Sequence, residues 1–510
     1  IFGKWTSTRW NHQTACLTLV LLQLSLFGDL LGPWGHGAVL SSSLGDLDQH
    51  FIAWRLFAAN QLRHGILPLW TPAYLGGTPF LGGFESALFY PFNLLFLLFS
   101  FPVAANLEIF FQVWMAGFFS YGWAASRGWR PGACLLVACG VSWSGPFFLQ
   151  VYAGHLSNLC AMAWIPPVVW ALEEVMKKTS RRWGIVLAAG VGLQGLAGHP
   201  QYSYYTAMMI LIYALILGWG DRARFQKWAV AATAYGFGGL LAMAQWLPGL
   251  QAVLESSRGR LDDFKTAGLF SLPPENVLTL FLPGFFGPVG SAQYWGRWYL
   301  WDVCLFVGWS LLFLCGYGLF RNRWRSPREL LMIGIAFLLA IGQSTPLFRL
   351  LFDYLPGYRS FRGTCKFDIF IVLFIVLLAG SGFDALTREK RSGKGPVKFL
   401  GAVAVVASLL GITIKISAAR GLAGIWGSWL TSIHWLRGPL SRVGRSTLDH
   451  FARSAGLQSA ESLFLLAATA VVLAGAVVWV GRNPKGWVVL GFVAVAELFI
   501  FARAHRPTFD

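Results

Sequence analysis

Charged side chains are scarce in this chain. Only 12% of its 510 residues are Asp, Glu, Lys or Arg, whereas 56% are hydrophobic. A soluble domain carries about twice that share of charge on its surface. The composition therefore excludes a soluble globular protein and predicts an all-α, polytopic helical bundle whose solvent is the lipid bilayer.

Metal-binding and disulfide motifs are also lacking. The seven cysteines lie mostly inside apolar runs, and none belongs to a CxxC pair or to a Cys/His cluster with ligand spacing. This distribution indicates neither a disulfide framework nor a metal centre. No Gly-rich loop that could cradle nucleotide phosphates follows a strand pattern. We therefore expect any donor substrate to be lipid-borne or extracytoplasmic.

Apolar runs of membrane-spanning length recur along the whole chain and predict about thirteen spans. They are expected near residues 14–31, 103–125, 132–150, 157–175, 183–199, 202–219, 228–250, 302–320, 329–345, 366–385, 398–417, 461–480 and 486–502. We divide them into a transmembrane core, residues 1–385, and C-terminal transmembrane segments, residues 386–510.

The basic residues predict the orientation of these spans. A net charge of +18 would suggest nucleic acid as the partner of a soluble protein. Here, however, most of this charge falls in short loops between apolar runs, where it marks the cytoplasmic side and contacts anionic lipids. We therefore expect no nucleic-acid partner. The loops assigned to the cytoplasm are 177–183, 221–227, 321–328 and 387–398.

These four cytoplasmic loops agree with one alternating topology only if residues 88–100 do not cross the membrane. The stretch is short and follows a proline, so it is predicted to be an interfacial or re-entrant helix. The segments that then face outward are the loops 33–102 and 251–301, residues 345–365 and the basic segment 418–460.

The first outward loop is structured, because its apolar residues recur at helical spacing. Leu47, Phe51, Trp54, Ala58 and Leu62 form one predicted face. Arg55, Asn60, Gln61 and Arg63 are expected off that face. The pattern indicates an amphipathic helix along the membrane surface.

Two carboxylates, Asp46 and Asp48, begin this helix in the motif GDLDQH. Asp46 with Gln49 three residues later resembles a helix N-cap, and Asp48 suits the first turn. Equally, a carboxylate at the outer membrane surface can act as a base on an acceptor hydroxyl. The sequence leaves capping and catalysis open. Glu85 is a further candidate, although such a residue is more often simply solvated.

Two histidine turns, around His155 and His199, are predicted at outer helix ends. Each contains a glycine that permits a sharp turn beside a ring able to donate to an anion. A lone histidine there is more often structural, but Pro200 and Gln201 make the second turn stiff and polar. The aromatic run YWGRWYLWD in loop 251–301 suits a carbohydrate face, although a membrane-interface belt is the commoner reading.

Basic residues predicted on the outer side need a reason, because Lys and Arg usually concentrate in the cytoplasmic loops of membrane proteins. The segment STPLFRLLFDYLPGYRSFRGTCKFD contains four of them: Arg349, Arg359, Arg362 and Lys366. Guanidinium groups over an apolar groove suit a lipid-linked phosphate. Binding of ordinary anionic lipid is the alternative.

Taken together, these segments resemble the YfhO-like bacterial membrane proteins of the GT-C superfamily of glycosyltransferases. The resemblance rests on GDLDQHFIAW, GILPLWTPAYLGGTPFLGGFESALFYPFNLLF, AGHPQYSYYT, LLAMAQWLPGLQAVLESSRG, FSLPPENVLTLFLPGFFG and TPLFRLLFDYLPGYRSFRGTCKFDIFIVLFIVLLAGSGFDAL. The family tends towards FRxPxRF where this chain reads FRGTCKFD, so Lys366 stands where arginine is usual. The substitution keeps the charge but loses the guanidinium fork.

The resemblance implies a GT-C-like fold and a donor of the polyprenyl-phosphate-sugar type. It places the base at Asp46 or Asp48 and basic residues at the donor phosphate. Whether a divalent metal also binds there is left open. We expect sugar transfer to an extracytoplasmic acceptor in the bacterial inner (cytoplasmic) membrane. The expected site comprises Asp46, Asp48, Glu85, His199, Gln201, Arg359, Arg362 and Lys366.

The competing reading is a non-catalytic GT-C-like scaffold subunit with membrane-protein partners. A transporter is less favoured, because charged residues within the spans are few and no inverted repeat is evident.

Overall fold

The computed structural model describes residues 11–31, 37–73, 76–256, 263–291, 293–321, 326–388, 394–440, 444–483 and 486–510. Within these ranges the chain is almost entirely helical, and its only strands are two short antiparallel pairs. Eight helices are long and apolar enough to cross a membrane, or up to ten if two bent helix pairs each count as one span. The protein is therefore an all-α, multi-pass membrane protein.

The eight spans run through the length of the bundle. They are His12–Leu30 (beginning with α1, His12–Phe27), α4 (Phe101–Ser126), Leu156–Lys178 (α7, Leu156–Ala163, with α8, Ile165–Lys178), α10 (Pro200–Gly218), Thr364–Arg388 (with α18, Asp368–Arg388), α19 (Lys394–Ala419), α22 (Arg445–Arg482) and α23 (Gly486–Ala504). The bent pairs are α5 (Pro131–Ser142) with α6 (Gly145–Ala153), at 42°, and α11 (Arg224–Leu241) with α12 (Met243–Glu255), at 73°.

The prediction of about thirteen spans stays a prediction. Each predicted range overlaps a helix, but three of these helices are short: α9 (Arg181–Leu196), α15 (Trp309–Arg321) and α16 (Pro327–Ala340), with 16, 13 and 14 residues. A helix needs about 20 residues to cross the hydrocarbon core. Apolar loop residues next to these helices lengthened the runs in the sequence.

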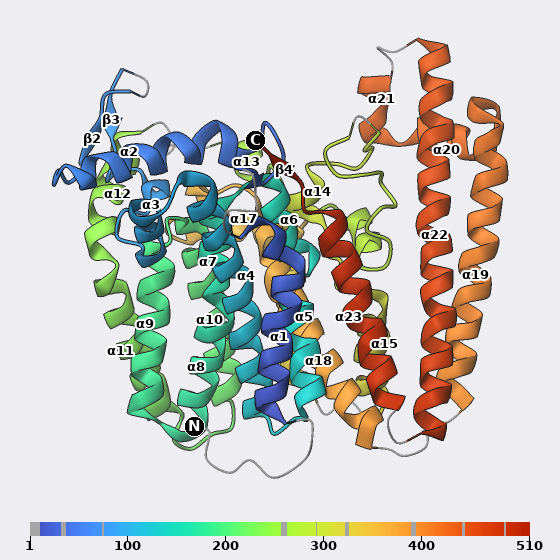
Figure 1. Ribbon diagram of the computed structural model, residues 1–510, viewed down its shortest axis with the longest axis horizontal. Coiled ribbons are helices and arrows are strands. Elements are labelled where there is room, and N and C mark those ends of the chain that lie inside the picture. Colours follow the sequence, from blue (N-terminus) through green and yellow to red (C-terminus); the bar gives the residue numbers. More distant parts are fainter. Residues whose placement is uncertain are drawn as a thin grey trace.

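The centre of the bundle is formed by Leu156–Lys178 and Thr364–Arg388, whose side chains are the most completely buried of the spans. The pair α19 and α22 packs together at the edge, visible at the right of Figure 1, and most of its side chains face outward from the protein. With 38 residues, α22 is about 57 Å long at 1.5 Å per residue, well beyond the hydrocarbon core. Its first turns therefore project from the bundle, as Figure 1 shows.

Short elements gather at one end of the bundle. They are β1 (Val39–Leu40), α2 (Ile52–Arg63), β2 (Trp70–Thr71), β3 (Thr78–Pro79), α3 (Leu95–Leu98), α13 (Phe264–Ala267), α14 (Leu300–Val303), α17 (Pro346–Tyr354), α20 (Ile425–Ser432), α21 (His434–Leu440) and β4 (Thr508–Phe509). Strand β1 pairs with β4, and β2 pairs with β3. In Figure 1, α2, the β2–β3 hairpin, α21 and the projecting end of α22 lie at this end.

The prediction that residues 88–100 do not cross the membrane is confirmed. The stretch contains a 3-10 turn, Pro91–Leu94, and the four-residue helix α3. It packs against α2, and the Arg63 Nη2 atom donates to the Phe96 carbonyl at 2.9 Å. The amphipathic helix also forms, as a π-helical turn, Leu47–Phe51, that continues into α2.

One residue of that helix was assigned to the wrong face. Arg55, expected on the polar face, is only 2% exposed. The turn at Glu85 and Ser86 lies against this side of α2 and accepts hydrogen bonds from Arg55, and this tertiary contact overrides the local pattern.

Candidate functional site

A cavity of about 880 Å³ opens at the end of the bundle that carries the short elements. Its lining comes from distant parts of the chain: residues 42–51, the turn at Glu85, residues 152–158, the start of α10, residues 266–270, residue 290, residues 299–302 and residues 360–366. The predicted residues that line it are Asp46, Glu85, His155, His199, Gln201, Arg362 and Lys366. Two further candidates, Asp48 and Arg359, are not among its lining residues.

Asp46 faces this cavity and pairs with a histidine. Its Oδ2 atom lies 3.1 Å from Nε2 of His155, while the other ring nitrogen of His155 lies 2.8 Å from the Gln150 side-chain oxygen. The hydrogen bond from His155 lowers the pKa of the Asp46 carboxyl. Asp46 makes no capping hydrogen bond through its side chain. The capping interpretation was therefore wrong, and the side chain remains 62% exposed, available to a ligand.

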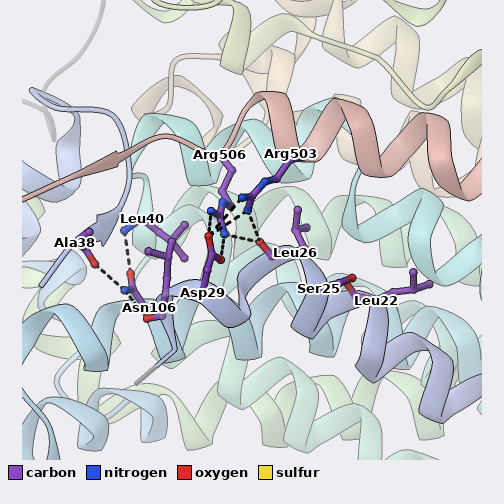
Figure 2. A network of polar contacts seen from close by, with 10 residues as sticks. Leu22, Ser25, Leu26, Asp29, Ala38, Leu40, Asn106, Arg503 and Arg506 are labelled. Atoms are coloured by element: carbon purple, nitrogen blue, oxygen red, sulfur yellow. Dashed lines mark hydrogen bonds and ion pairs between the residues drawn. The ribbon is translucent and has the colours of Figure 1, made fainter. Parts of the chain in front are cut away.

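The segment that leads to Asp46 is held by contacts to distant helices. The Asn106 side chain on α4 donates to the carbonyls of Leu30 and Ala38 and accepts from the Leu40 N–H at 2.9 Å (Figure 2). Strand β1 then pairs with β4. These bonds satisfy the backbone where the chain leaves the first span, and they fix the direction in which it approaches the cavity.

The same region is tied to the last span by an ion cluster. Arg503, in the last turn of α23, and Arg506, just after that helix, both reach the carboxylate of Asp29, and both also donate to the Leu26 carbonyl (Figure 2). Residues nearly five hundred positions apart in sequence thus meet directly beside the segment that carries Asp46. No local pattern in the sequence could have indicated this contact.

Gly154 allows the turn that presents His155 to approach the Asp46 loop. Its φ is +73°, in the left-handed region. A Cβ atom there would lie 2.5 Å from the Ser41 hydroxyl and 2.7 Å from the Leu47 backbone nitrogen. Only glycine accommodates both the backbone conformation and this close contact.

Asp48 has a local structural role. Its Oδ2 atom accepts a hydrogen bond from the Leu44 N–H at 3.1 Å, and Leu44 itself has a φ of +62°. The carboxylate thus stabilises a strained turn just before Asp46. Of the two acids that the sequence could not separate, only Asp46 lines the cavity.

Glu85 lies at the cavity beside His50, with 2.9 Å between the carboxylate and the ring. The turn that carries it is held by the buried guanidinium of Arg55, whose Nη1 atom donates to the carbonyls of Glu85 and Ser86 at 3.0 and 2.8 Å. Burial lowers the pKa of Arg55, and the nearby Glu108 opposes this effect. Sequence analysis missed this role, because the helical pattern assigns Arg55 to the solvent.

His199 and Gln201 anchor the site. The Nδ1 atom of His199 accepts from the Tyr202 N–H at 3.3 Å, which caps α10. The Gln201 amide donates to the carbonyls of Arg362 and Gly363. Gln201 thereby joins α10 to the FRGTCKFD segment, and its amide nitrogen is already committed to these backbone partners.

The two cations of that segment differ in their surroundings. Arg362 is exposed, lies over the ring of Phe270 at 5.5 Å, and forms no ion pair with any described residue. Lys366 is largely buried, with its Nζ atom 3.7 Å from Oδ1 of Asp302. Asp302, which sequence analysis did not single out, therefore balances Lys366, and Arg362 carries the unbalanced charge.

Stacked aromatic rings form one wall of the cavity. Tyr299 and Trp301 stack at 4.6 Å with an angle of 6° between their planes. Trp301 also stacks on Tyr152, and Tyr299 on Phe270. All four residues line the cavity. The aromatic run that the sequence could assign to a membrane belt thus contributes to the wall of the site.

The acids and histidines that line this site do not gather into one cluster among the described residues. No group of three or more His, Cys, Asp and Glu side chains among them is arranged to hold an ion. The acids instead pair separately, Asp46 with His155 and Glu85 with His50.

Neither a protein-family model nor a curated protein matches the chain. Among solved structures the chain is similar to ArnT from Cupriavidus metallidurans in the apo state, with 13% sequence identity and a TM-score of 0.47. The match covers 97% of this chain and 77% of the other. A likeness this distant assigns neither an activity nor site residues.

Proposed function

We propose that this protein transfers a sugar from a polyprenyl-phosphate donor to an acceptor hydroxyl, with Asp46 as the general base. The observation that carries the proposal is the arrangement of the cavity. An ionised, exposed carboxylate and an unbalanced guanidinium line one space at the end of an apolar bundle. A lipid-linked donor needs both, because its head must be neutralised while its tail stays in hydrocarbon.

The charges of the lining support a donor with a single phosphate. Lys366 is balanced by Asp302, so Arg362 is the cation left to neutralise a ligand within the described lining. A phosphodiester carries one negative charge, which one guanidinium can match with two parallel hydrogen bonds. A diphosphate would need further cations. The lysine in place of the family's arginine thus serves as the partner of Asp302, and Arg362 supplies the fork.

In the proposed reaction the acceptor hydroxyl gives its proton to Asp46 while its oxygen attacks the anomeric carbon of the sugar. The bond between that carbon and the phosphate oxygen breaks, and the electron pair leaves with the polyprenyl phosphate. Attack from the face opposite the leaving group inverts the anomeric centre. His155 orients Asp46 and keeps it ionised, while Arg362 stabilises the charge that develops on the phosphate.

The aromatic wall supports a sugar as the transferred group. Tyr299 and Trp301 line the cavity beside the charged residues, and Tyr299 is 53% exposed. Sugar rings present C–H groups on one face and hydroxyls at their edge, so they pack on such a surface while polar groups hold the edge.

The scaffold alternative predicts a groove plugged by side chains. A cavity of about 880 Å³ is instead large enough for a sugar, a phosphate and the first prenyl units. We therefore favour the enzyme. In the proposal the cavity faces the outside of the bacterial inner membrane, with anionic lipids and membrane-protein partners around the bundle.

The experiment compares Asp46→Asn with Asp48→Asn. The two acids are two residues apart, but only Asp46 lines the cavity, so Asp48→Asn is a matched control. The parent and both variants are reconstituted with tritiated polyprenyl-phosphate hexoses, and transfer to cell-envelope glycan and release of free sugar to water are both counted. We expect Asp46→Asn to lose about 10²–10⁴-fold in rate and Asp48→Asn to stay within a few-fold of the parent.

Equal rates for the parent and Asp46→Asn would exclude this base. A parent that folds normally but transfers no sugar from any of these donors would instead favour the scaffold. Binding of polyprenyl phosphate to the parent and to Arg362→Met separates a wrong base from the absence of a donor site. If the protein is a scaffold without a donor site, Arg362→Met binds polyprenyl phosphate as well as the parent does.

A further inference from the structure

A second cavity of about 390 Å³ lies between α19 and α22, on the edge of the bundle. It is lined by Lys394, Val397, Lys398, Val477, Val478, Gly481 and Arg482. Among the described residues, the lining therefore combines three cations with three valines and contains no carboxylate. In Figure 1 the start of α19 and the end of α22 lie together, at the opposite end of the bundle from α2.

Within the described part of the chain, no acidic side chain neutralises these three cations. None of them forms an ion pair with a described residue. At the ends of neighbouring helices, by contrast, cations have acidic partners: Arg127 pairs with Glu173 and Glu329, and Arg388 pairs with Asp384. Three like charges around one cavity repel one another unless an anion lies between them.

The position of the cavity decides what kind of anion can reach it. Lys394 is the first residue of one candidate span and Arg482 is the last of another. Residues at the ends of spans lie at the level of the lipid headgroups, about 15 Å from the bilayer centre. The valines continue from this level towards the hydrocarbon, because Val397 is one turn inside Lys394 and Val478 is one turn inside Arg482.

We propose that this cavity binds an acidic phospholipid, with the phosphate between Lys394, Lys398 and Arg482 and the start of the acyl chains against the valines. Lys394 and Lys398 are four residues apart, so their side chains lie on the same face of α19. Arg482 reaches the phosphate from the facing helix. The valines favour a lipid over free phosphate, because a water-soluble anion gains nothing from an apolar wall.

The site is independent of sugar transfer. It lies on other helices and at the other end of the bundle from Asp46, and with the orientation that the basic loops predict it faces the cytoplasmic leaflet, where acidic lipids are concentrated. A bound lipid would hold the ends of α19 and α22 together. This pair packs on the core only along one side, and its exposed face consists largely of apolar side chains.

The test measures phosphatidylglycerol binding to the purified full chain by native mass spectrometry, with phosphatidylcholine as the neutral lipid. The pocket variant combines Lys394→Ala, Lys398→Ala and Arg482→Ala. The matched control, Lys178→Ala with Arg181→Ala and Arg182→Ala, removes three exposed cations from the end of α8 and the start of α9. Each cation near a charged membrane contributes about five-fold in affinity, so we expect the pocket variant to bind phosphatidylglycerol at least ten-fold more weakly. The control should stay within two-fold of the parent.

Three results would overturn the proposal. The first is a parent that binds phosphatidylglycerol no better than phosphatidylcholine. The second is an equal loss in the pocket and control variants, which would indicate diffuse attraction to a basic face. The third is displacement of the lipid by millimolar inorganic phosphate, which would identify a site for the free anion. If the triple variant does not fold, Lys398→Ala alone should lose about five-fold, and Lys398→Arg should restore binding.

Discussion

Replacing Arg55 with methionine tests how the turn at Glu85 is held beside the cavity. The Arg55 guanidinium is buried and donates from one nitrogen to two consecutive carbonyls, those of Glu85 and Ser86. Ala87, which follows, has a φ of +44°, an unfavourable conformation for a residue with a side chain. The turn therefore depends on an external partner. Methionine fills nearly the same volume but donates no hydrogen bond.

The expected cost follows from these contacts. A hydrogen bond from a charged donor contributes about 1.5–3 kcal/mol, so two of them contribute about 3–6 kcal/mol. Removing a buried cation recovers part of this, because its desolvation is relieved. We expect a net loss of about 2–4 kcal/mol in the free energy of unfolding for Arg55→Met.

Arg63→Met is the matched control. Arg63 lies on the same helix and also donates from one nitrogen to two consecutive carbonyls, those of Phe96 and Leu97, but it is exposed. Its loss should cost about 1 kcal/mol or less, because water replaces the bonds. Unfolding by sodium dodecyl sulfate in mixed micelles measures both variants. If Arg55→Met proves as stable as Arg63→Met, the turn at Glu85 does not depend on the buried guanidinium.

Two further predictions concern the Asp46 loop. The His155 hydrogen bond lowers the pKa of Asp46, so this carboxylate stays ionised to a lower pH than an ordinary aspartate. The contribution of the pair to the free energy of unfolding is therefore lost only as the pH falls through this lowered pKa. In His155→Ala the acidic limb of the pH–rate profile should therefore move to higher pH, and an unmoved limb would argue against the pair. Gly154→Ala should destabilise the protein by about 3 kcal/mol and reduce transfer, because it combines left-handed strain with overpacking against Leu47. Gly128→Ala is its control in thermal melts: φ is similar, at +76°, but no atom lies within 4 Å of the added carbon, and about 1 kcal/mol is expected.

The sequence by itself determined the class of fold and the composition of much of the cavity. Hydropathy is a property of consecutive residues, so the apolar runs included all eight candidate spans, and the short run 88–100 was correctly predicted not to cross the membrane. Unusual polar residues near the ends of predicted spans pointed to Asp46, His199 and Arg362, because a membrane protein has few reasons to keep them there. Hydropathy and residue type depend only on the local sequence, so folding does not change them.

Tertiary structure alone decided which residues meet. Asp46 and Asp48 look alike in the motif GDLDQH, and only the pairing with His155, from a turn more than a hundred residues away, separates them. Burial of Arg55 and the pairing of Lys366 with Asp302 follow from segments that fold back over the helices. Such pairs have no period along the chain, since they are set by the packing of distant elements and by the need to compensate every buried charge.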